Sequence, residues 1–96
     1  MATSAAIERF LASPALSEAT RRSYRADLRD FTAWLEERGA PLDNVDVRVL
    51  ADYTAELGRS RRRLAPATIA RRLAAVRSLL RFTFGPARVP AASLAP

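Results

Sequence analysis

Cysteine, histidine and lysine are all absent from this 96-residue chain, and glycine occurs only three times. The lack of cysteine excludes a disulfide framework and thiol chemistry. The lack of histidine removes the commonest metal ligand and the commonest general base, so we expect no metal and no other cofactor. No apolar run is long enough to span a membrane, and the N-terminus does not read as a secretory signal. We therefore expect one small cytoplasmic domain, with neither a membrane nor a small-molecule substrate as its partner.

Acidic residues are missing from the second part of the chain. All ten lie before Gly58, together with seven of the sixteen arginines, whereas residues 58–96 hold nine arginines and no acid. A coding bias would explain why every basic residue is arginine, but it would not separate arginines from acids. The flat guanidinium fork pairs well with phosphate oxygens, so this concentration of charge favours a phosphate backbone as partner. The charge pattern indicates a nucleic-acid-binding surface.

Apolar residues recur with helical spacing, and no stretch alternates as a strand would. We predict an all-α bundle of four helices, at about residues 4–12, 17–38, 46–57 and 66–84. Ser17 and Asp46 are the expected N-caps, and Pro66 suits a first helical position. Gly39 is a natural C-terminal stop. Residues 86–96, rich in proline and alanine, look like a linker or tail.

The apolar stripes of these helices define the expected core. Its members are Ile7, Phe10, Leu11, Tyr24, Leu28, Phe31, Leu35, Leu50, Tyr53, Leu57, Ile69, Leu73, Val76 and Leu80. Trp34 lies off the stripe of its helix, which leaves its place open. Leu79, Phe82 and Phe84 either close the core or form an apolar patch on the surface.

The spacing of the arginines brings like charges together and so lowers helix stability. On the helix at 17–38 they lie on one flank of the apolar stripe, with Asp27 and Asp30 on the other. Arg21, Arg25 and Arg29 form a row of like charges, which destabilises an isolated helix. Such a row indicates a polyanionic partner, unless the arginine stems only cover apolar edges of a solvated face.

The loop before the last helix adds to this positive surface. Arg59 and residues 61–63 are arginines that lead directly into a helix N-terminus, whose free N–H groups attract anions. Thr20 and Thr68 lie in the first turns of the two basic helices. A hydroxyl there either bonds a phosphate or caps its own backbone.

Two stretches resemble the core-binding domain of tyrosine recombinases, the family of the Xer-type resolvases and phage integrases. The run from Leu16 to Phe31, followed by Trp34-Leu35 and Gly39, is similar to the family pattern LS..T...Y..DL..F..WL...G. Residues 67–78 look like the family's T..R.LSALRS helix. Residues 90–96 are similar to the short linker that precedes the catalytic domain.

The resemblance implies a small SAM-like bundle that lies over one face of duplex DNA, with two helices crossing the major groove. It divides the chain into a core-binding domain at 1–85 and a linker at 86–96 toward a C-terminal catalytic domain. It also implies that this chain is not itself an enzyme, because the family's catalytic histidine and lysine have no counterpart here. Other recombinase protomers would be partners of the full-length protein. Together with the basic loop, it gives a DNA-binding set of Thr20, Arg22, Ser23, Arg25, Arg61, Arg62, Arg63, Thr68, Arg71, Arg72 and Arg77.

Two other interpretations stay open. A helix-turn-helix regulator requires helices separated by three or four residues, whereas about seven arginine-rich residues separate the last two helices here. A helical module that binds an acidic protein requires an exposed apolar patch beside the basic surface, which Leu79, Phe82 and Phe84 would supply.

Overall fold

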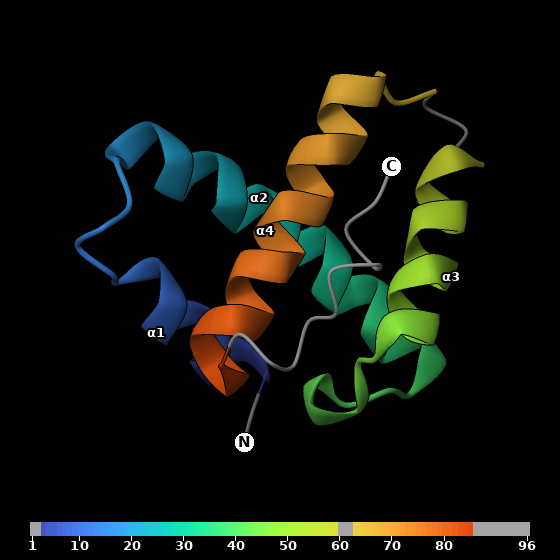
Figure 1. Ribbon diagram of the computed structural model, residues 1–96, viewed down its shortest axis with the longest axis horizontal. Helices are drawn as coiled ribbons and strands as arrows, with labels where there is room; N and C mark the ends of the chain where they lie inside the picture. The colour runs from blue at the N-terminus through green and yellow to red at the C-terminus, as the bar shows by residue number, and fades with distance from the viewer. Residues whose placement is uncertain (1–2, 60–62, 86–96) are drawn as a thin grey trace.

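The computed structural model describes residues 3–59 and 63–85. In these ranges the chain forms four α-helices and a short 3-10 helix, with no strand (Figure 1). Their bounds are α1 (Thr3–Leu11), α2 (Glu18–Arg38), η1 (Leu42–Asn44), α3 (Val47–Gly58) and α4 (Pro66–Phe84). The all-α prediction is confirmed, and each predicted helix end lies within one residue of the observed one. The segment 86–96, predicted as a linker, lies outside the described residues.

The helix ends follow from local chemistry. The side chains of Ser17 and Asp46 accept backbone N–H bonds from the residues three positions on, at 3.1 and 2.9 Å. Gly39 ends α2 in the left-handed region at φ 66°, and the N–H of Ala40 donates to the Leu35 carbonyl. This is a Schellman arrangement, which satisfies the last carbonyls of the helix. The predicted caps are confirmed.

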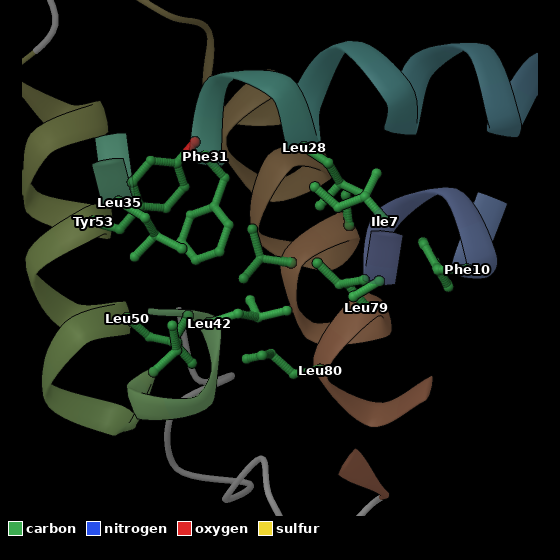
Figure 2. Packing of buried hydrophobic residues seen from close by; sticks show 14 of the residues in the cluster. Ile7, Phe10, Leu28, Phe31, Leu35, Leu42, Leu50, Tyr53, Leu79 and Leu80 are labelled. Carbon is green, nitrogen blue, oxygen red and sulfur yellow. The ribbon is translucent and has the colours of Figure 1, made fainter. Parts of the chain in front are cut away.

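The four helices enclose one apolar core, and Figure 2 shows side chains of Phe31, Tyr53 and Leu79 converging from three of them. Most of the predicted core is buried, namely Ile7, Phe10, Leu11, Leu28, Phe31, Leu35, Leu50, Tyr53, Leu57, Val76 and Leu80. The predicted members Tyr24, Ile69 and Leu73 are only partly buried and pack around it. The 3-10 helix, which the sequence did not predict, brings Leu42 and Val45 into the core between α2 and α3.

Helices α2 and α4 are the central pair. They pack against each other, α1 packs against both, and α3 packs against α4. In Figure 1 α4 crosses α2. Asp27, in the third turn of α2, contacts Arg71, in the second turn of α4, so the first halves of the two helices meet there. Among the described helices, none has the length and apolar character of a membrane span.

The apolar residues whose place was open are mostly structural. Leu79 is fully buried and Phe84 packs against the core, so both close it. Phe82 is 48% exposed, with its ring 5.5 Å from that of Phe10. Trp34 is partly buried, and its ring centroid lies 5.0 Å from that of Tyr53.

Two glycines provide a matched test of the backbone. A Cβ at Gly39 or at Gly58 would meet no atom within 4 Å, but only Gly39 has a positive φ, of 66°. Gly39→Ala should therefore destabilise the domain by about 1 kcal/mol through backbone strain. Gly58→Ala, at the end of α3, should stabilise it by about 0.5–1 kcal/mol through lower entropy of the unfolded chain. Urea unfolding of both variants measures the two signs, and destabilisation of equal size would contradict the φ-based account.

Candidate nucleic-acid interface

A buried carboxylate joins α2 to α4. Asp27 on α2 is 1% exposed and accepts two hydrogen bonds from Arg71 on α4. The Nε and Nη2 atoms of Arg71 each lie 2.9 Å from one carboxylate oxygen, which is a bidentate pair. Arg72 lies close as well, with its Nε 3.8 Å from the same carboxylate. The charge of Asp27 is thus compensated, as a buried charge requires.

The same network reaches α3. Asp30, one turn after Asp27, forms an ion pair with Arg72, whose Nη1 lies 3.0 Å from the Asp30 carboxylate. The same carboxylate accepts a hydrogen bond from the Tyr53 hydroxyl at 2.7 Å. Burial raises the pKa of the Tyr53 phenol above its ordinary value, and the hydrogen bond to Asp30 and the charge of Asp30 raise this pKa further. The hydrogen bond to Asp27 and the charge of Asp27 raise the pKa of Arg71. Tyr53 therefore stays a neutral donor, and one polar chain links three helices.

Contacts with α1 and with the connection between α1 and α2 reduce the charge repulsion within the arginine row of α2. Arg25 pairs with Glu8 of α1 at 2.9 Å. Arg21 donates to the carbonyls of Leu11, Ser13 and Leu16, which fixes the connection between the two helices. It also pairs with Glu18. Arg21 thus has a structural role, and the guanidinium of Arg25 is held by the Glu8 carboxylate through its Nη1 atom.

The remaining described residues of the predicted set lie in the first half of α2, just before α4 and along α4. Thr20 takes part in the α2 cap, where its hydroxyl accepts a 2.9 Å hydrogen bond from Ser17. Arg22 is exposed, whereas Ser23, Thr68 and Arg77 are partly buried. Arg63 is exposed as well and adopts φ 49°, an unusual conformation for a residue with a side chain. Arg61 and Arg62 lie outside the described residues.

Pairing leaves a surplus of positive charge on this side. Glu18, Asp27 and Asp30 of α2 each pair with an arginine, and α4 has no carboxylate. Exposed arginines without an ion pair to the described residues are Arg22 and Arg29 on α2, Arg63 before α4 and Arg81 at its end, and also Arg9 on α1 and Arg48 on α3. The N-cap of α4, Ala65, makes no side-chain hydrogen bond, and the first turn holds no acid. The positive end of that helix is therefore uncompensated, which suits an anion.

Sequence reasoning missed the carboxylate anchors of this surface. By helical angle, Asp27 and Asp30 fall on the acidic flank of α2, and the sequence pattern predicted no ion-pair partner for either. Asp27 lies only about 60° from Tyr24 around the helix, at the edge of the apolar stripe. A carboxylate at that position, in a chain whose second part is rich in arginine and free of acid, had to find an arginine partner. That combination was the available signal.

These features define a four-helix domain with a positive surface on the crossing pair, and the comparisons with known proteins agree with that class. The chain belongs to the family described as the phage integrase N-terminal SAM-like domain, whose sequence profile matches residues 7–84. It is similar to the tyrosine recombinase XerD of Caulobacter vibrioides, at 39% identity over 66 residues. The match covers 69% of this chain and 21% of that relative. No solved structure matches the chain significantly. The resemblance found in the sequence is confirmed.

The Tyr53 hydroxyl provides a test of the network. Tyr53→Phe should lower the free energy of unfolding by about 1 kcal/mol at neutral pH, because one net hydrogen bond is lost. The folded state holds the phenol proton more tightly than the unfolded state. Tyr53 therefore makes its full contribution to the free energy of unfolding below the ordinary phenol pKa of 10.0, and this contribution falls as the pH rises above that value.

Urea unfolding at neutral pH and above pH 10 measures both effects. The difference in stability between wild type and Tyr53→Phe should shrink or change sign at the higher pH. A constant difference across this range would show that the ionisation of Tyr53 is not coupled to folding.

Proposed function

We propose that this chain binds duplex DNA as the core-binding domain of a site-specific tyrosine recombinase or integrase, mainly through phosphate contacts. The observation that carries the proposal is a group of exposed arginines without an ion pair to the described residues, namely Arg22 and Arg29 on α2, Arg63 just before α4 and Arg81 in its last turn. A guanidinium that has no carboxylate partner is ready to pair with a phosphate oxygen. Family membership gives this surface a DNA-recombining context.

The proposed contacts divide by chemistry. Arg22, Ser23 and Arg71 are the candidates for base edges, since arginine pairs bidentately with guanine in the major groove. The candidates for phosphate are Thr20, Thr68, Arg25, Arg61, Arg62, Arg63, Arg72 and Arg77. The arginines already in ion pairs remain in the set because a guanidinium has five N–H donors, and a bidentate pair uses two of them.

Strand cleavage and joining would belong to another part of the longer protein. The matched segment is 21% of the XerD relative, and this chain has neither histidine nor lysine. We propose that its own contribution is binding and positioning of DNA, with other recombinase protomers as further partners.

The alternatives have less support. An interaction module required an apolar patch at the end of α4, but Leu79 is buried there, Phe84 packs against the core and only Phe82 is well exposed. A helix-turn-helix pair would need a shorter connection than the seven residues between Gly58 and Pro66.

The salt dependence of binding tests the proposal. Neutralising roughly 5–7 phosphates predicts a log–log slope of about −5 to −6. In fluorescence anisotropy with random duplex DNA from 50 to 300 mM salt, Arg22→Ala/Arg63→Ala should flatten the slope by about 2.

Arg48→Ala, which removes one positive charge where the double variant removes two, is the control for this experiment. Arg48 is exposed in the first turn of α3, and Figure 1 places that turn at the opposite end of α3 from the connection to α4. The control should leave the slope unchanged. Absence of binding by the folded chain at 50 mM salt would refute DNA binding, and equal effects of the variants would refute the assigned face.

A further inference from the structure

We infer that Asp27 is a positioning residue for DNA recognition, because it holds the guanidinium of Arg71 through two hydrogen bonds while the Arg71 side chain stays 47% exposed. The inference rests on the proposed DNA-binding function and goes beyond it, since it assigns a task in recognition to a buried acid on the opposite helix. On this account Arg71 is the residue of α4 whose side chain is already ordered for DNA before DNA binds.

The hydrogen bonds of Arg71 determine which donors remain free. Asp27 occupies the side of the guanidinium formed by Nε and Nη2, with both bonds at 2.9 Å. Both hydrogens of Nη1 and one hydrogen of Nη2 are left over. One hydrogen of Nη1 and the remaining hydrogen of Nη2 form the end-on fork, two parallel donors that fit two phosphate oxygens, or O6 and N7 of guanine.

The burial of the pair is strongly asymmetric. The side chain of Asp27 is 1% exposed, whereas that of Arg71 is 47% exposed. Next to Asp27, Leu28 is completely buried in the core, so the helix cannot move the carboxylate without disturbing the packing. One end of the pair is fixed inside the protein and the other reaches solvent.

This arrangement lowers the cost of binding. A free arginine side chain has many rotamers and loses them when it is immobilised against DNA. The carboxylate orders Arg71 before DNA arrives, and the ordering belongs to folding rather than to binding. Removal of the anchor should therefore weaken binding even though the charge of Arg71 is unchanged.

Arg72 differs from its neighbour. Its side chain is 18% exposed, and its donors face Asp30 at 3.0 Å and Asp27 at 3.8 Å. Arg72 thus ties the two helices together from the inside. Of the two adjacent arginines, Arg71 is the one whose guanidinium is both held and accessible.

Removing the charge of Asp27 separates positioning from simple electrostatics. Asp27→Asn removes a negative charge next to the proposed DNA surface, so electrostatics alone would tighten binding. The amide keeps the size of the carboxylate, but its NH₂ group cannot accept the second hydrogen bond of Arg71. Positioning therefore predicts the opposite sign, with binding weakened three- to tenfold.

The test is anisotropy binding of the full chain to duplex DNA at fixed salt, at a temperature where circular dichroism shows each variant folded. Asp27→Asn is compared with Asp52→Asn, a matched loss of one negative charge. The Asp52 side chain is 47% exposed and pairs with Arg38 at the end of α2, away from Arg71. We expect Asp52→Asn to bind as well as the wild type or slightly better.

A double-mutant cycle with Arg71→Ala shows whether Asp27 acts through Arg71. The weakening caused by Asp27→Asn should vanish in the Arg71→Ala background, where only the small electrostatic gain remains, a result that a general structural effect would not give. Unchanged or tighter binding by Asp27→Asn, or an equal loss in both backgrounds, would overturn the inference.

Arg71→Lys keeps the test decisive if Asp27→Asn does not fold. Lysine retains the charge and a bond to Asp27 but has no fork, so binding should again fall three- to tenfold. Wild-type affinity of Arg71→Lys or Arg71→Ala would overturn the inference and leave the proposed function intact. Absence of DNA binding by the wild type would instead refute the proposed function.

Discussion

The structure depends on a single carboxylate buried where α2 and α4 pack together. An uncompensated charge at the position of Asp27 would cost several kcal/mol, so the helices must pack in a register that brings arginines of α4 to it. A shift of α4 by one turn would move Arg71 about 5.4 Å along its axis and break the bidentate pair. Apolar packing tolerates many similar arrangements, whereas this pair has a narrow geometry. It therefore fixes which faces of α2 and α4 point outward.

The pairing also decides where the positive charge is available. By formal charge, the segment after Gly58 is the basic part of the chain. In the fold, Asp27 and Asp30 of α2 offset Arg71 and Arg72 of α4, and Glu8 of α1 offsets Arg25. The accessible surplus is carried by arginines from both parts, such as Arg22 and Arg63. The surface is thus a property of the helix pair and not of the basic segment alone.

Local features of the chain predicted the helices well, and the contacts between helices less well. Ser17, Gly39, Asp46 and Pro66 act within one turn of their own helix, so their effects could be predicted from the sequence. The 3-10 helix at Leu42–Asn44 is too short to show a period, and its core contacts depend on where α2 and α3 are placed. The pair between Asp27 and Arg71 joins residues 44 apart, and it exists only because the helices cross there.

The unequal exposure of the two partners is what would let one ion pair serve both stability and the proposed recognition of DNA. If both side chains were buried, the pair would hold the helices together but present nothing to a ligand. If both were exposed, the pair would contribute at most about 1 kcal/mol and would leave the arginine free to reorient. With the acid inside and the arginine at the surface, the packing that stabilises α2 and α4 also orders an arginine side chain that solvent reaches. The contacts of Arg72 and Tyr53 with Asp30 extend this support to α3, so three helices contribute to the network that surrounds the base of Arg71.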